Sequence, residues 1–331
     1  MSENTMDVSE FRRQAEAESE QAAQEEKSFR EVLEGSRPKR RSGNRGLAAP
    51  TPAADQDDLA AALTVVRNPR ASETLRAAAL HAIGAGVTER PDLIDGLLDV
   101  LRDQSVPTDQ RLGVLNLLQQ ISFQMVGFPG KRPAYLEALR SIVDDPDAEL
   151  RRRAIGILAR EKDEYVQRRL VEGLQGTAKA LVPAAKAIQF LGYDVHAEYY
   201  PMLRRIVEKP PNQAAKKEAM QLLAADPSSE DLMVRILKDK SEKSDVRRVS
   251  AVALQSMAPA RLAVEARRMV VDDSEDDDLR AVLLNTLTYF GNGADLAGDA
   301  ELNRHVEGLT AGSTSKQLKQ AGAAYMSKHP T

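Results

Sequence analysis

A short helical pattern recurs along this chain from about residue 57 to the C-terminal end, at steps of 31 to 40 residues. The clearest copy reads Leu150-Arg151-x-x-Ala154-Ile155-x-x-Leu158, in which apolar residues recur at helical spacing. The second residues of the eight copies are Arg76, Arg111, Arg151, Val182, Lys216, Arg247, Arg280 and Lys319. A period of this size is typical of an α-solenoid, in which each helix pair buries its apolar face against its neighbours. The sequence therefore predicts an all-α fold: a right-handed α-solenoid of about eight helix pairs, an architecture that usually serves as a binding surface.

Each repeat is expected to contain a first helix, a turn and a second helix. The expected pairs cover about 58–85, 91–123, 133–160, 163–191, 197–225, 229–257, 260–290 and 299–328. Residues expected to cap the second helices are Ser72, Thr108, Asp147, Asp245 and Asp278. The arginine that follows such a residue can pair with an acid of its own or the next unit. Because an exposed pair contributes only about 0–1 kcal/mol, aliphatic burial is expected to carry the stability.

Composition restricts the chemistry further. The chain has no Trp, six Phe and seven Tyr, so its core must be built mainly from aliphatic side chains. With no Cys, it can form no disulfide and no cysteine-based metal or nucleophile site, which fits a reducing compartment. No apolar run reaches the roughly 18–20 residues of a membrane span, and the N-terminus lacks the apolar core of a secretory signal. We expect a cytoplasmic protein.

Charge divides the chain into three segments. Residues 1–36 hold ten acids and four bases and favour a helix, giving an acidic arm that is either a single helix or disordered. Residues 37–56 begin with a basic stretch that contains five bases and continue as an Ala/Pro-rich linker. Residues 57–331, the predicted solenoid, are nearly balanced in charge, unlike a typical nucleic-acid-binding domain.

The repeats resemble the HEAT repeat family, whose pattern places an Asp in the turn between two helices and an Arg early in the second helix. The matching residues are the pairs Asp109/Arg111, Asp147/Arg151 and Asp245/Arg247. The resemblance covers about 270 of the 331 residues and implies an α-solenoid. Val182 and Lys216 replace the Arg in two units, so a continuous Asp/Arg ladder is not expected there.

Related solenoids include enzymes, but their motifs are missing from this sequence. HEAT-like iron hydroxylases bind metal through His-Glu dipeptides, and HEAT-like DNA glycosylases use a basic groove lined by Trp; this chain has neither. The triplet Asp194-x-His196-x-Glu198 is the one local cluster that resembles metal ligands, and we interpret it as a helix cap. No cofactor is predicted.

Three segments are candidates for partner binding. An acidic run that includes Asp272, Asp273, Asp276 and Asp277 is either a solvated turn or a dock for a basic partner such as the protein's own basic segment. That segment, with Arg37, Lys39, Arg40 and Arg41, is a linker, a contact for acidic protein, or an attachment point for nucleic acid or an anionic surface. Phe128, flanked by Lys131 and Arg132, is either an exposed aromatic hook or the core of a tight turn.

From the sequence we predict a non-enzymatic scaffold or adaptor that binds a protein partner along the solenoid surface. The N-terminal arm would act as a tether or regulator, with Phe11, Phe29, Val32 and Leu33 as the apolar face of a helix that enters a groove. Two alternatives remain open. One is a HEAT-like lyase or enzyme subunit acting on a small molecule, and the other is nucleic-acid attachment through the basic segment.

Overall fold

The computed structural model describes residues 56–123 and 128–329, and in this part of the chain every regular element is a helix. The first six α-helices are α2 (Gln56–Arg67), α3 (Glu73–Gly86), α4 (Asp92–Arg102), α5 (Thr108–Ile121), α6 (Arg132–Ser141) and α7 (Ala148–Arg160). The next six are α8 (Glu164–Gln175), α9 (Ala184–Leu191), α10 (Tyr200–Glu208), α11 (Gln213–Leu223), α12 (Glu230–Lys238) and α13 (Ser244–Met257). The last five are α14 (Pro259–Val270), α15 (Asp277–Phe290), α16 (Gly293–Ala297), α17 (Ala300–Gly312) and α18 (Lys316–Lys328). The all-α prediction is confirmed, while the right-handed sense of the array stays a prediction.

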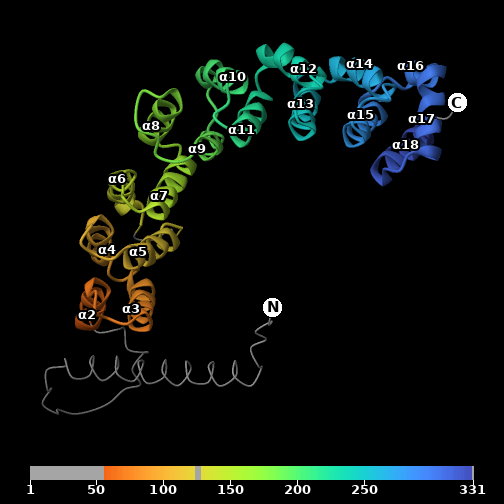
Figure 1. The fold of residues 1–331 in the computed structure, drawn as a ribbon. Coiled ribbons are helices and arrows are strands. Elements are labelled where there is room, and N and C mark those ends of the chain that lie inside the picture. The colour runs from red at the N-terminus through yellow and green to blue at the C-terminus, as the bar shows by residue number, and fades with distance from the viewer. Residues whose placement is uncertain (1–55, 124–127, 330–331) are drawn as a thin grey trace, which may run out of the picture. The chain divides into compact units, whose positions relative to one another are not determined.

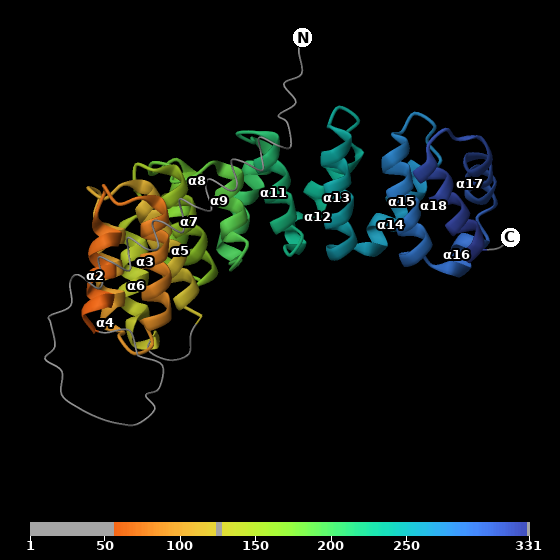
Figure 2. The same ribbon diagram turned by 90° about the horizontal axis from the view of Figure 1, so that it is seen from below.

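The helices form two compact units, and the boundary between them follows Leu158, inside α7. In the first unit α2 packs on α3 and α4 packs on α5, and α2–α4, α3–α5 and α4–α6 contacts join successive pairs. In the second unit α10, α12 and α14 each pack on the helix that follows them. Their partners form one layer, because α9, α11, α13, α15 and α18 contact one another in succession (Figure 1). Figure 2 shows α13, α15 and α18 of this layer side by side.

The expected helix boundaries agree closely with the structure because turn residues mark them. The first pair was expected at 58–66 and 73–85 and is found at Gln56–Arg67 and Glu73–Gly86. Ser72 caps α3 by accepting a hydrogen bond from the Leu75 amide, and Asp147 likewise accepts from the first amides of α7. The other three expected caps are wrong: Thr108, Asp245 and Asp278 lie inside the first turns of α5, α13 and α15.

A basic residue near the start of the second helix links each of several pairs to the next pair. Arg111 and Arg247 donate from Nε to the carbonyl oxygen ten residues earlier, in the last turn of the first helix of the pair, at 3.0 and 2.8 Å. Their outer nitrogens bind an acid of the following pair. Arg111 reaches Asp145 at 2.5 Å, and Arg247 holds both carboxylate oxygens of Glu275 at 2.6 Å. We call these contacts the turn ladder.

Burial of the turn ladder corrects one expectation from the sequence. The side chains of Arg111 and Asp145 are 3% and 1% exposed, so the pairs are not the weak surface contacts that we expected. The predicted pairing of an arginine with an acid of the next unit is confirmed, since Arg76 binds Asp109, and Lys217 binds Asp245 in the same way. A buried pair of this kind is costly to break, because removal of one partner leaves an unpaired charge away from water.

The fifth and fourth helix pairs differ in the turn ladder. In the fifth pair, Lys216 replaces the Arg of the repeat pattern, and from the sequence a continuous ladder is not expected there. Lys216 is nevertheless buried and donates to Glu242, so the fifth pair is still joined to the next pair. Val182, at the equivalent position of the fourth pair, carries no charge and is buried among apolar neighbours. The fourth pair is therefore held by apolar packing at the place where other pairs use a buried cation.

Aliphatic side chains fill the core of both units, as the composition predicts. Leu97, Leu118 and Leu150 in the first unit and Leu254 and Leu284 in the second are fully buried. Of the helices in residues 56–123 and 128–329, none combines the length and apolar character needed to cross a membrane.

Candidate functional site

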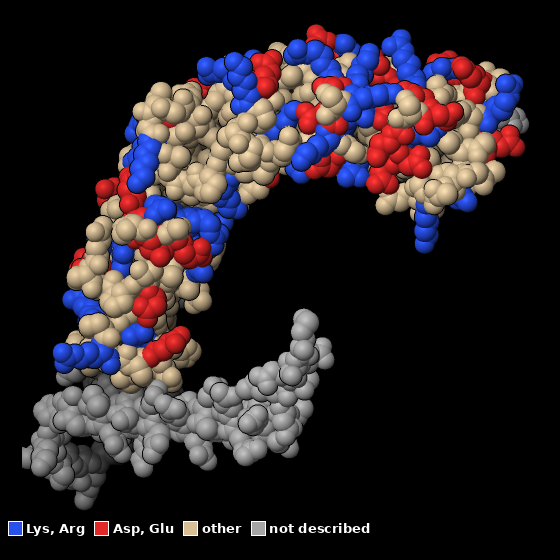
Figure 3. Space-filling view, viewed as in Figure 1, with Lys and Arg blue, Asp and Glu red and all other residues tan. Residues whose placement is uncertain are grey.

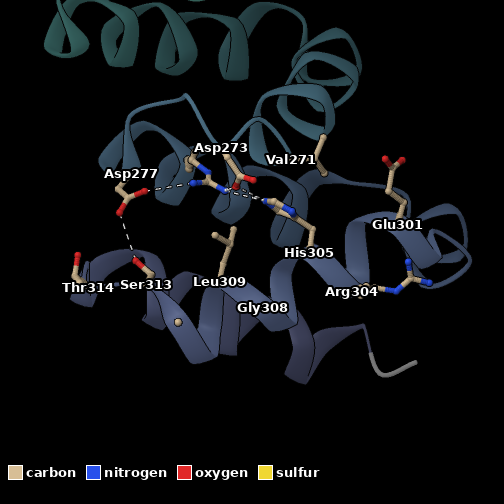
Figure 4. A pocket seen from close by; sticks show the side chains of 12 residues that line it. Val271, Asp273, Asp277, Glu301, Arg304, His305, Gly308, Leu309, Ser313 and Thr314 are labelled. Carbon is tan, nitrogen blue, oxygen red and sulfur yellow. Dashed lines mark hydrogen bonds and ion pairs between the residues drawn. The ribbon is translucent and has the colours of Figure 1, made fainter.

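The largest concentration of acidic residues borders a pocket in the second unit. The pocket has a volume of about 770 Å³ and lies between the turn that precedes α15 and one face of α17. Asp273 and Asp277, both predicted as partner-binding residues, line it, and Figure 4 shows them with His305 around a common centre. Acidic side chains also gather over this part of the second unit in the space-filling view (Figure 3).

Arg280 contacts three of the polar residues that line the pocket. Its side chain is 5% exposed, and its Nε donates to the Val270 carbonyl at 3.2 Å, as in the turn ladder. One outer nitrogen lies 3.2 Å from Asp273 and 2.8 Å from His305, and the other lies 3.4 Å from Asp277. Arg280 is therefore the cation that holds the two aspartates and the histidine together.

The contact with Arg280 fixes the hydrogen-bonding role of His305. A guanidinium can only donate, so Nε2 of His305 must accept from it, and Nδ1 then carries the ring hydrogen. Ser313 also lines the pocket, and its hydroxyl donates to Asp277 at 3.4 Å. These polar groups are hydrogen-bonded to one another.

The rim of the pocket is more accessible. Asp273 exposes 84% of its side chain, and Glu301 is exposed although it binds Arg267 at 2.7 Å. Two glycines of α17, Gly308 and Gly312, leave that wall open, since a Cβ on either would meet nothing within 4 Å. The pocket can therefore admit a side chain of a partner.

The rest of the acidic run faces the preceding helix pair. Asp272 binds Lys240 at 2.6 Å, and this ion pair holds the pKa of Asp272 well below its usual range. Asp276 caps α15 and accepts from the hydroxyl of Ser244 at 2.8 Å. Asp272 and Asp276 thus join the turns of neighbouring pairs, whereas Asp273 and Asp277 meet in the pocket.

The structure decides between the two interpretations of Phe128, an exposed hook or the core of a tight turn. Phe128 is 2% exposed and packs edge-on against Tyr135, with ring centroids 5.4 Å apart, so it forms the core of the turn before α6. Lys131 binds Asp95 of α4 at 2.6 Å, and Arg132 is exposed at the first position of α6. The exposed aromatic in this region is Phe123, at 81%, because it follows the end of α5 instead of facing the core.

The cluster around His196 does not cap a helix as expected. Asp194 accepts hydrogen bonds from Gln167 and lies 3.1 Å from His196 Nε2, while the short helical turn after His196 has no side-chain cap. The contact with Gln167, from α8, lowers the pKa of Asp194. In the part of the chain that the structure describes, no group of three or more His, Cys, Asp or Glu side chains could hold a metal ion.

The predicted residues of the arm and basic segment lie outside the described residues. They are Phe11, Phe29, Val32, Leu33, Arg37, Lys39, Arg40 and Arg41.

Sequence reasoning missed a groove between α11 and α13. It has a volume of about 830 Å³, and α13 lines it with Asp245, Arg248, Val249, Val252 and Ser256. These residues recur at helical spacing on the side of α13 opposite Val246 and Leu254, which face the core. Val252 is 60% exposed, although it is a β-branched apolar residue in the middle of a helix. An apolar residue outside the core stripe was the signal that could have revealed the groove.

Comparisons with known proteins add no family to this description. No family model matches the chain, and no curated protein matches its sequence.

Proposed function

We propose that this protein is a non-enzymatic scaffold or adaptor that binds a protein partner on the surface formed by its second helices. The observation that carries this proposal is the α11–α13 groove, which the exposed Val252 lines. A second helix normally exposes polar side chains at such positions, so an apolar floor between charged edges matches the apolar face of a partner segment.

The groove has the chemical layout of a site for an amphipathic helix. Val249, Val252 and Ala253 from α13 line it together with Ala214 from α11 and Ala224, which follows the end of α11. The edge carries a Lys217–Asp245 ion pair at 2.7 Å, and Arg248 lies 3.6 Å from Asp278. A partner helix would bury the apolar floor, and its polar side chains would meet these charges at the rim.

The enzyme alternative calls for a deep pocket in which several polar groups converge on a small molecule. The Arg280 pocket contains such groups, but they are bonded to one another, which favours the scaffold. The nucleic-acid alternative depends on the basic segment at 37–45, outside the described residues.

A photo-crosslinking amino acid at position 252 tests the proposal in the full-length chain, expressed in the cells from which the gene comes. Position 264 is the matched control, because Val264 is also an exposed valine, at 53%, but lies in α14, a first helix. The proposal expects one discrete protein adduct from position 252 and none from position 264. The same adducts from both positions, or none from either, would contradict it.

The arm enters the proposal as a tether or regulator. Phe11→Ser together with Phe29→Ser, in the full-length chain, should change the affinity for the partner identified by crosslinking. If every affinity is unchanged, the apolar face of the arm has no role in binding.

A further inference from the structure

The fourth helix pair contains a second kind of cavity, which is partly open and is lined mainly by apolar side chains. It has a volume of about 310 Å³ and lies among α8, the segment before α9, and α10. Its walls come from Leu170, Leu174, Leu181, Val182 and Ile206, with small residues of α9 between them. The volume is at the lower end of the roughly 300–1,000 Å³ that small-molecule sites occupy.

The irregular connection between α8 and α9 explains why a cavity forms here. α8 ends at Gly176, whose φ of 75° lies in the left-handed region that favours glycine, and α9 begins only at Ala184. The connection folds back tightly: a Cβ on Gly173 would lie 3.1 Å from the Cα of Ala180. Val182 lines the cavity with an apolar side chain, at the position where Arg111, Lys216 and Arg247 of other pairs carry a buried charge.

One charged side chain, Lys209, lines this cavity. Lys209 follows the last residue of α10 and is exposed. Within residues 56–123 and 128–329, its ammonium group makes no ion pair or hydrogen bond, unlike Lys216, Lys217 and Lys240, which each bind a carboxylate. An apolar chamber with a single unpaired cation thus remains open to a ligand.

The lining selects the chemistry of that ligand. A peptide brings an amide and a carbonyl with each residue, and these need partners when buried. The side chains of the lining provide one polar group, Lys209, so the ligand should have a single polar end and a hydrocarbon body. We propose that the cavity binds a linear aliphatic monocarboxylate, with its tail between α8 and α9 and its carboxylate at Lys209. The proposal stands independently of partner binding in the α11–α13 groove.

Titration of the full-length protein with hexanoate, octanoate, decanoate and dodecanoate by calorimetry tests the proposal. Each added methylene should tighten binding about fourfold until the tail exceeds the cavity, the ratio that about 0.8 kcal/mol per buried methylene gives. Lys209→Gln should weaken decanoate binding by about tenfold and leave decanol binding unchanged. Lys319→Gln, which removes an exposed lysine of α18, is the matched control and should change neither.

Ala184→Leu should fill the cavity and abolish binding of both decanoate and decanol. Circular dichroism and the thermal midpoint of the variant show whether the fold is kept. If the wild-type protein binds none of the acids, or binds them without dependence on chain length, the proposal is wrong. It is also wrong if only a partner protein, and no acid, loses affinity in Ala184→Leu, because the cavity would then hold a side chain of that protein.

Discussion

Arg247 and Glu275 form a bidentate ion pair between neighbouring helix pairs. Both nitrogen–oxygen distances are 2.6 Å, and both side chains are almost completely buried. Nε of the same arginine closes the turn of its own pair through the Leu237 carbonyl. One side chain thus fixes a turn and joins two repeats.

Loss of Arg247 should therefore destabilise the second unit strongly. Arg247→Ala leaves Glu275 buried without a counter-charge, and we expect a loss of about 3–5 kcal/mol in the free energy of unfolding, measured by urea titration at 222 nm. Arg261→Ala is the matched control: Arg261 binds Glu230 and Asp231 at the surface, and its loss should leave the midpoint nearly unchanged. Replacement of both partners, Arg247→Met with Glu275→Leu, should restore most of the loss. Equal effects of the two alanine variants would show that burial of the pair has no energetic importance.

Phe128 should behave as a core residue. Phe128→Ala removes a buried ring packed on Tyr135, and a loss of about 3–5 kcal/mol in the stability of the first unit is expected from the lost burial and the cavity left behind. Phe123→Ala, at an exposed site five residues earlier, should change stability by less than about 0.5 kcal/mol. Thermal unfolding of both variants measures the difference. If the Phe128→Ala protein is as stable as the wild-type protein, Phe128 is not a core residue.

Acid should remove the contribution of Glu149 to stability. Hydrogen bonds from Arg152, and then from Arg153, lower its pKa from 4.5 to about 2. Because the folded-state pKa is depressed, the contribution is present above about pH 4.5 and is lost as pH falls toward 2. The side chain is partly exposed, so the effect should stay below about 1 kcal/mol. Glu149→Gln should lower the urea midpoint at pH 7 and leave it unchanged at pH 2. A difference that persists at pH 2 would have another cause.

High pH should remove the contribution of Tyr325 to the stability of the fold. Burial raises the pKa of its hydroxyl to about 12, and the hydroxyl donates to Asn303 at 2.9 Å. Since the folded-state pKa is raised above 10, the contribution is present below pH 10 and is lost as pH rises toward 12. Tyr325→Phe should reduce stability by about 1–3 kcal/mol at pH 7, because Asn303 is left unsatisfied, and this difference should shrink between pH 10 and 12. Stability measurements across this range, with Tyr289→Phe as the exposed control, test the expectation.

Contacts within a helix pair were predictable, and those between pairs were not. The turn at 68–72 and the spacing of Leu75, Ala79 and Ile83 are local features, so the first pair was placed within two residues at each end. The partner of Arg111 is Asp145, 34 residues away, and its choice depends on how two pairs stack. Phe128 is buried and Val252 is exposed for the same reason, since tertiary packing and not sequence neighbours decides which apolar residue is covered.

The central claim is that a protein partner binds in the α11–α13 groove. The affinity of the partner for two valine variants tests it most directly. The purified partner, identified by crosslinking at position 252, is titrated against full-length Val252→Asp and Val264→Asp. Both changes place a carboxylate at an exposed site and should leave the fold intact. We predict at least a tenfold loss of affinity for Val252→Asp and none for Val264→Asp, because only the first carboxylate would be buried in the complex. Equal affinities for the two variants would contradict the claim.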